Sequence, residues 1–239
     1  MYIIFLAVLA IYNVLLPLFF AWKNRNTLPV PATEEARIKG YIEIIILGWG
    51  SALVVLLLCL FAGISFYDIG LREISLAPNI WVTVITFILC GIYMLAYIGE
   101  TIAYLVNPKY REEQKETLAK RHPNGSVNKL LPRSKTERKY WVFVSLTAGI
   151  CEEIIFRGFL FYFLQAVFPN MPILFVVVVS STVFGIAHAY QGIRGMRNTA
   201  LVGALHGVLF LATGSLILPM FMHFIVDISS VFLLSEDTE

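Results

Sequence analysis

The chain has 239 residues, of which 58% are hydrophobic and only 14% are charged, and its mean hydropathy is +0.77. A soluble globular domain carries about a quarter of its residues as charges, so the composition excludes that class, and it excludes disordered, collagen-like and coiled-coil chains as well. The net charge of +2 is too small and too unevenly spread to indicate nucleic-acid binding. The composition is that of an integral membrane protein.

The apolar residues are gathered into seven runs that predict membrane helices. The first run has neither positive residues ahead of it nor a small-residue cleavage site, so we expect a retained helix and not a signal peptide. None of the runs alternates polar and apolar residues as the strands of a membrane barrel do. The sequence therefore predicts an all-α, polytopic transmembrane helical bundle built from the runs 1–22, 41–66, 80–106, 140–168, 172–190, 199–212 and 216–234.

The fourth run, 140–168, is too long for a single straight span. As one helix it would extend about 43 Å, whereas the hydrocarbon core of a bilayer is about 30 Å thick. Either its first turns lie in the cytosolic interface or the helix breaks near Gly149 into two. The expected count is therefore seven to eight spans.

The charges between the runs predict the orientation of the chain. The segment 107–139 holds ten of the 18 Lys and Arg residues and is expected to be a solvated basic loop. Arg194 and Arg197 lie between the fifth and sixth runs, whereas the loops on the alternate side contribute only Arg72. Because basic loops stay in the cytosol, we expect a multi-pass protein of the cell membrane with its N-terminus outside.

Ionisable residues interrupt the apolar runs in the second half of the chain. A charged residue at a helix centre costs about 2.5 to 3.5 kcal/mol on insertion scales, while each Leu or Phe returns only about 0.3 to 0.6 kcal/mol. A purely structural bundle can use cheaper small-residue packing, so these residues indicate a functional site. They are Glu152, Glu153, Arg157, His188, His206, His223 and Asp227.

The segment 152–157, EEIIFR, predicts one paired and one free carboxylate. Glu153 and Arg157 are spaced i, i+4 with the acid first, so they can pair along one helix face. Glu152 is rotated by roughly 100° from Glu153 and stays free to act as a base. The alternative is a purely structural ion-pair cluster.

Three histidines lie in the runs that follow. His188 ends the segment FGIAH near the predicted cytosolic end of its run, and by itself it is more typical of an anchor than of a catalyst. His223 and Asp227 share one helix face at i, i+4, so the carboxylate can orient the imidazole; metal ligation, acid–base catalysis and a proton relay all stay open. His206 has no partner at helical spacing and is interpreted as a packing or supporting residue.

These motifs, in this order, resemble the CPBP family of intramembrane proteases, which includes the type II CAAX prenyl endopeptidases and bacterial relatives linked to bacteriocin handling. The family pattern is EExxxR, FxxxH and HxxxN/D, and here the motifs are EEIIFR at 152–157, FGIAH at 184–188 and HFIVD at 223–227. The chain is also similar at Gly158 and at the segment TGSL, 213–216. The resemblance covers roughly residues 140 to 231.

The resemblance implies a peptidase and a division of the chain by role. We expect N-terminal transmembrane helices with a basic cytosolic loop, a catalytic transmembrane core and a short acidic tail, in the ranges 1–139, 140–234 and 235–239. The implied site has a pair that activates a water, a pair that stabilises the oxyanion or completes the site, and a supporting pair. These pairs are Glu152 with His188, His223 with Asp227, and Glu153 with Arg157.

One position departs from the family pattern, because Asp227 stands where Asn is common. An ionised Asp cannot donate a hydrogen bond to an oxyanion, so Asp227 would have to be protonated or to orient His223.

The family is commonly labelled metalloprotease, although a mechanism without metal has also been argued for it. Four side chains could offer zinc N and O ligands and leave a water position: Glu152, His188, His223 and Asp227. Since the chain lacks HExxH, we expect a metal-free reaction, with a zinc-dependent version as the alternative.

The expected partners are the lipid bilayer and a membrane-associated peptide or protein, either prenylated or bacteriocin-related; nucleic acid is not expected. Two other classes use similar residues: a proton-coupled transporter and a non-catalytic membrane scaffold.

The motifs also raise a question about how deep in the membrane the site residues lie. His188 lies near the predicted cytosolic surface, whereas Glu152 lies twelve residues beyond Tyr140. If both act on one water, the helix before Gly149 should tilt or break, so that the site opens to the cytosol.

Overall fold

The computed structural model describes residues 33–121 and 131–234, and every regular element in this part of the chain is a helix. The elements are α3 (Glu34–Phe61), α4 (Ile80–Val106), α5 (Pro108–Arg121), α6 (Lys135–Thr147), the π-helical segments η2 (Ala148–Glu152) and η3 (Ile154–Phe159), α7 (Leu160–Val167), α8 (Ile173–Ala187), the 3-10 turn η4 (Ala189–Gln191), α9 (Gly192–Thr213) and α10 (Ile217–Leu234). The prediction of an all-α fold is confirmed for these residues. The first predicted span, 1–22, and the acidic tail, 235–239, lie outside them.

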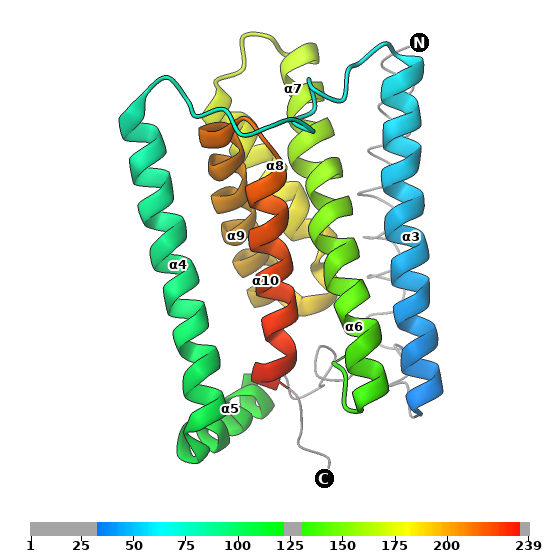
Figure 1. The fold of residues 1–239 in the computed structure, drawn as a ribbon, viewed down its shortest axis with the longest axis vertical. Coiled ribbons are helices and arrows are strands. Elements are labelled where there is room, and N and C mark those ends of the chain that lie inside the picture. The colour runs from blue at the N-terminus through cyan, green and yellow to red at the C-terminus, as the bar shows by residue number, and fades with distance from the viewer. Residues whose placement is uncertain (1–32, 122–130, 235–239) are drawn as a thin grey trace.

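Figure 1 shows how the helices are arranged. α6, η2, η3 and α7 follow one another end to end and form a central column, residues 135–167. α3 packs on one side of this column against α6, while α4 lies at the opposite edge and packs on α9 and α10. α5 and the start of α6 lie at one end of the bundle, here called the base, and the turns that lead into α4, α8 and α10 lie at the other end, the top.

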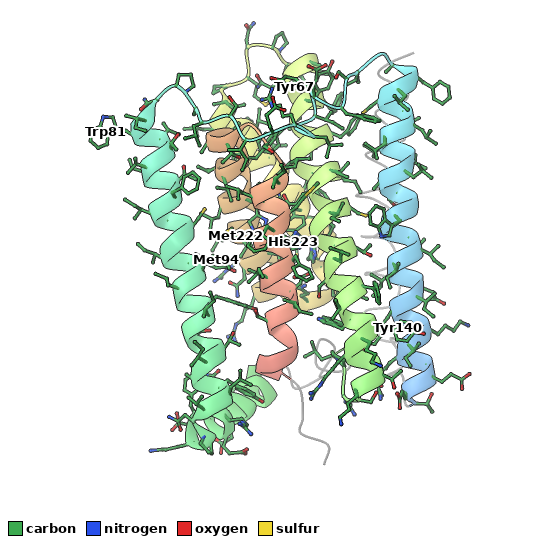
Figure 2. All side chains as sticks on the ribbon, in the orientation of Figure 1. Tyr67, Trp81, Met94, Tyr140, Met222 and His223 are labelled. Carbon is green, nitrogen blue, oxygen red and sulfur yellow. The ribbon has the colours of Figure 1, made fainter. Side chains whose placement is uncertain are left out.

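Two of the described helices, α3 and α4, are long and apolar enough to cross a membrane. α8 and the segment Ala189–Thr213 meet the same criterion together, but they are bent by 61° and form either a broken span or a re-entrant loop. The described residues therefore hold two or three candidate spans, and the expected seven to eight spans stay a prediction. Apolar side chains point outward from both long helices, as Trp81 does at the top of α4 (Figure 2), which fits a surface that faces lipid.

The central column does not break at Gly149, as one alternative for the fourth run required. The helix widens there instead, because η2 and η3 are wound as π-helix over the segment that carries EEIIFR. A Cβ atom at Gly149 would lie 3.0 Å from the carbonyl oxygen of Met220 and 3.1 Å from the backbone nitrogen of Phe224. The missing side chain thus lets α10 approach the column directly before the first motif.

Part of the segment 107–139 is helical, which corrects the prediction of a solvated loop. Asn107 accepts hydrogen bonds through Oδ1 from the backbone N–H groups of Lys109 and Tyr110, at 3.1 and 3.2 Å, and Pro108 is the first residue of α5. An Asn cap followed by Pro is a common start of a helix. The sequence therefore contained the start signal of a helix, but the polarity of the segment led to the prediction of a loop.

A buried ion pair ties α3 to α6 at the base. Arg37 donates from Nε and Nη2 to Glu137 Oε1, at 2.9 and 2.7 Å, and Glu137 also completes a capping box with Ser134 at the start of α6. Glu137 lies before the apolar run of the column. Burial alone would raise the pKa of this carboxyl, but the hydrogen bonds from Arg37 and from the backbone of Arg133 hold the pKa below its ordinary value.

We expect Glu137→Gln to destabilise the bundle by about 3 kcal/mol at neutral pH, because it removes the buried carboxylate to which Arg37 donates two hydrogen bonds. The pKa of Glu137 is lower in the folded chain than in the unfolded one, so its contribution is complete above the unfolded-state pKa and is lost as the pH falls through the folded-state pKa. Thermal unfolding in detergent should show a difference between wild type and variant that closes only in acid. A difference that stays constant down to the lowest pH at which the protein folds would contradict this assignment.

The connection between α3 and α4 closes the top of the bundle. The backbone N–H of Ser75 donates to the carbonyl of Thr213 at 2.8 Å, which satisfies a group at the end of α9. In return, the backbone N–H of Leu216 donates to the carbonyl of Gly70 at 2.9 Å. These contacts fix where α9 ends and where α10 begins, and therefore the height of the histidines on both helices.

Candidate active site

The residues predicted for the site meet inside the bundle, where the central column, the end of α8 and α10 come together. Figure 2 shows His223 on α10 at about mid-height, while the neighbouring Met222 lies on the side of Met94 of α4. The column contributes three of the predicted residues, and all six are within reach of one another or of His223. They are Glu152, Glu153, Arg157, His188, His223 and Asp227.

A bend in the fifth run solves the problem of depth. α8 has only 15 residues, about 22 Å, and starts at the top, so His188 at its end lies inside the bundle and not at its surface. There the helix pair formed by α8 and the segment Ala189–Thr213 is bent by 61°. Gly185 permits the close return, because a Cβ atom there would lie 2.6 Å from the carbonyl oxygen of Met196. Neither a break nor a tilt of the column is needed to bring His188 to Glu152.

Glu153 is the centre of a buried group that we call the inner cluster: Glu153, Arg157, His206 and His223. Its Oε1 accepts hydrogen bonds from Arg157 Nη1 at 3.1 Å, from His206 Nδ1 at 2.9 Å and from His223 Nδ1 at 2.8 Å. Because an ionised carboxylate only accepts, both imidazoles present Nδ1–H to it. The predicted pairing of Glu153 with Arg157 is confirmed, and all four side chains are buried.

Phe184, the first residue of FGIAH, packs its aromatic ring against this cluster. The guanidinium carbon of Arg157 lies 4.1 Å from the centroid of the Phe184 ring, a cation–π contact. The same ring lies 4.7 Å from the ring of His188 and 6.0 Å from that of His223. The structure therefore gives a reason for an aromatic residue at this motif position, which the sequence alone did not show.

Glu152 belongs to a second, more open group, the outer group: Glu152, His188, Asp227 and the Nε2 edge of His223. Glu152 Oε2 lies 3.9 Å from His188 Nε2 and 3.8 Å from His223 Nε2, and His223 Nε2 lies 3.7 Å from Asp227 Oδ2. These separations exceed a direct hydrogen bond and fit a single bridging water. The side chains of Glu152 and Asp227 are 30% and 33% exposed, so the group lies near the protein surface, while Glu152 Oε2 itself is turned inward and buried.

The tautomer of neutral His188 follows from its own hydrogen bond. Its Nδ1 lies 2.9 Å from the carbonyl oxygen of Phe184, which can only accept, so Nδ1 carries the hydrogen. The lone pair on Nε2 then faces Glu152 Oε2, which has no hydrogen-bond partner among the described residues. A water between these two acceptors would donate one hydrogen to each, and this is the geometry that turns water into a nucleophile.

The closest set of metal-binding side chains in the described part of the chain is not the predicted one. The ligand atoms of Glu153, His206 and His223 lie within 4.8 Å of one another, but Arg157 already brings a positive charge to the same Glu153 oxygen. Around Glu152, the separations of 3.7 to 3.9 Å between donor atoms are short enough for two donors to share a zinc ion, because zinc bonds of about 2.0 to 2.1 Å span up to about 4.2 Å. Among the described residues only the inner cluster brings three such side chains within 4.8 Å of one another, whereas in the outer group only pairs of donors are this close.

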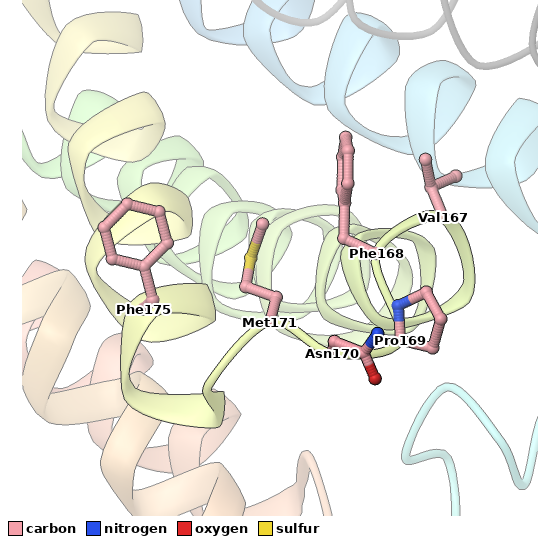
Figure 3. Close-up of a pocket in the computed structure, with 6 residues that line it drawn as sticks. All are labelled: Val167, Phe168, Pro169, Asn170, Met171 and Phe175. Atoms are coloured by element: carbon pink, nitrogen blue, oxygen red, sulfur yellow. The ribbon is translucent and has the colours of Figure 1, made fainter.

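An apolar surface hollow lies elsewhere, at the top of the bundle in the turn between α7 and α8 (Figure 3). It is lined by Val167, Phe168, Pro169, Asn170, Met171 and Phe175. None of these side chains can transfer a proton near neutral pH, so the hollow lacks the chemistry of the site described above.

The comparisons with known proteins agree with the motifs. A family model described as "Type II CAAX prenyl endopeptidase Rce1-like" matches residues 136–229, from the start of α6 to near the end of α10. Residues 136–229 are similar to this family. No curated protein and no solved structure matches the chain. The Rce1-like domain holds every residue of the inner cluster and of the outer group, and its family is one of peptidases that act on membrane-associated proteins.

His206 is the site residue whose contacts sequence reasoning missed. It lies in the Rce1-like domain but outside the three motifs, and it has no partner on its own helix. Its partner Glu153 is 53 residues away in the chain. The one available signal was the cost of placing an imidazole in an apolar run, which applies to His206 as it does to His188 and His223.

Proposed function

We propose that the chain is an intramembrane endopeptidase that hydrolyses a peptide bond of a membrane-associated or lipidated peptide or protein. The observation that carries the proposal is the pair of acceptors Glu152 Oε2 and His188 Nε2, which lie 3.9 Å apart inside an Rce1-like domain. In the proposed reaction, both groups hold the water and Glu152 takes its proton as the oxygen attacks the peptide carbonyl. Protonated Glu152 then gives the proton to the leaving amine.

His223 is suited to stabilise the negative charge that develops on the carbonyl oxygen. Its Nδ1–H is bound by Glu153, and its Nε2 points to the outer group. The carboxylates of Glu153, Glu152 and Asp227 lie 2.8, 3.8 and 3.7 Å from its ring nitrogens, and an imidazolium among these three anions would have a hydrogen on Nε2 to donate. Asp227 then acts by orienting this ring, as an ionised Asp at this position must.

The exposure of the site supports an active site that opens towards the cytosol. α10 runs from the top to the base, so Asp227 lies one turn nearer the base than His223. The Asp227 side chain is 33% exposed and the His223 side chain only 9%. The base also carries α5 and the start of α6, which belong to the segment 107–139, whose Lys and Arg residues favour the cytosolic side. A substrate anchored in the bilayer would therefore reach Glu152 from this end.

The alternative is the zinc-dependent version of the same reaction, in which an ion held by Glu152, His188, His223 and Asp227 would supply an activated water. We expect cleavage to survive prolonged dialysis against a strong zinc chelator, because Glu152 and His188 suffice to polarise the water. A known zinc peptidase treated in parallel shows that chelation is complete. Loss of cleavage that added zinc restores would contradict the metal-free mechanism.

Reconstitution into lipid vesicles tests the proposed function against a transporter and a scaffold. A membrane-anchored peptide library on the outside of the vesicles should be cleaved by the purified protein, and the products should be found by mass spectrometry. Proton flux that depends on Glu152, without any cleavage, would favour the transporter. If folded protein shows no cleavage and no proton flux, the result would favour the scaffold.

A further inference from the structure

We propose that His206 is a positioning residue of the peptidase site, acting through Glu153 to hold His223 in its working orientation. This inference rests on the proposed function, because it concerns the geometry of the same site. His206 is fully buried, so it cannot touch a substrate that enters through the outer group. Its Nδ1 lies 2.9 Å from Glu153 Oε1, the same atom that accepts the Nδ1–H of His223 at 2.8 Å.

His206 is needed as a third donor because the Glu153 side chain could otherwise rotate. Arg157 and Glu153 share one helix, so their hydrogen bond alone would move with that helix and would not fix the carboxylate relative to α10. His206 comes from α9 and His223 from α10, and their rings lie 5.4 Å apart. The oxygen Oε1 is thus held from three segments at once. The other oxygen, Oε2, has no hydrogen-bond partner among the described residues, so a rotated carboxylate would be the competing arrangement.

The orientation of His223 matters because this ring joins the inner cluster to the outer group. With Nδ1 on Glu153, its Nε2 lies 3.8 Å from Glu152 Oε2 and 3.7 Å from Asp227 Oδ2. If Glu153 rotates, the ring loses its fixed acceptor and Nε2 leaves the place where the carbonyl oxygen of a substrate becomes charged. A displacement of about 1 Å in a reacting group can cost about 100-fold in rate.

Two substitutions separate positioning from packing. His206→Leu keeps an apolar side chain of similar size and removes the donor, whereas His206→Asn keeps an N–H donor at the place of Nδ1. We expect His206→Leu to lower kcat by about 10- to 100-fold with little change in KM, and His206→Asn to recover most of kcat. A His206→Leu variant that keeps kcat, or a His206→Asn variant that falls equally far, would overturn the proposal.

A direct readout of His223 makes the test independent of activity. Nitrogen NMR of histidine-labelled protein in detergent should show a protected Nδ1–H on His223 in wild type and in His206→Asn, and should show its loss in His206→Leu. Thermal unfolding of each variant confirms that the folded form is compared. A wild-type His223 without a hydrogen on Nδ1, as for a ring that binds a metal through this atom, would overturn the proposal. Absence of cleavage by wild type would refute the proposed function, and the NMR signal would still decide the role of His206.

Discussion

Replacement of Glu152 by glutamine is expected to slow peptide cleavage by about 10²- to 10⁴-fold and to leave the fold intact. Glutamine preserves the size of the side chain and one acceptor oxygen, but it cannot take a proton from the attacking water or return one to the leaving amine. Glu152 lies in the partly open outer group and makes no hydrogen bond through Oε2, so the substitution breaks no buried contact of that atom. The measurement is kcat for a membrane-anchored peptide with protein in lipid vesicles.

The matched control is Glu100→Gln, the same change at an exposed position on α4. It should cleave at the wild-type rate, because it lies outside the site, and both variants should unfold at the wild-type temperature. If Glu152→Gln cleaves within a factor of two of Glu100→Gln, Glu152 is not the base. If it loses cleavage only together with folding, the ion-pair cluster is structural.

Replacement of Arg157 by methionine is expected to destabilise the protein by about 3 to 5 kcal/mol, the cost of removing one partner of a buried ion pair. Both side chains of the pair are fully buried, and Arg157 donates to Glu153 Oε1 at 3.1 Å. Methionine fills much of the space over the Phe184 ring, so the loss reports mainly the removal of the guanidinium from Glu153, which keeps its hydrogen bonds from His206 and His223. The change should appear as a lower thermal unfolding temperature in detergent and as a lower yield of folded protein.

A double substitution identifies the cause of this loss. Glu153→Gln removes the charge that Arg157→Met leaves behind, so the double variant should be more stable than Arg157→Met alone, in a double-mutant cycle with a clear coupling energy. Arg197→Met, at an exposed position on α9, controls for the loss of any one arginine. Additive effects of the two substitutions, or an equal loss in Arg197→Met, would contradict the account of the inner cluster.

Local spacing was enough to predict the contacts that form within one helix. The i, i+4 rule anticipated the ion pair of Glu153 with Arg157, and it placed His223 and Asp227 on one face of α10, where their nearest atoms lie 3.7 Å apart. Because consecutive residues of a helix are rotated by about 100°, Glu152 and Glu153 were expected to face different neighbours. These predictions succeed because they depend only on helix geometry.

The relations between helices could not be predicted in the same way. The run 172–190 was interpreted as a full span, which put His188 at the surface, whereas α8 ends inside the bundle and the chain turns back into α9 at Gly192, whose φ is +76°. The contact of His206 with Glu153 depends on how α9 packs against the column, and no sequence pattern predicts a contact between residues on different helices. The π-helical winding of η2 and η3 likewise reflects packing against α10 at Gly149 and has no composition signal of its own.

In the proposed reaction, the water held between Glu152 and His188 becomes part of the product. This claim is tested most directly by cleavage of a membrane-anchored peptide in water enriched in oxygen-18, with mass spectrometry of the new C-terminal fragment end. Wild-type protein is predicted to place one oxygen-18 atom in the new carboxylate within a single turnover, and Glu152→Gln to form almost no labelled product in the same time. Labelled product formed equally fast by Glu152→Gln, or a product without the label, would contradict the claim.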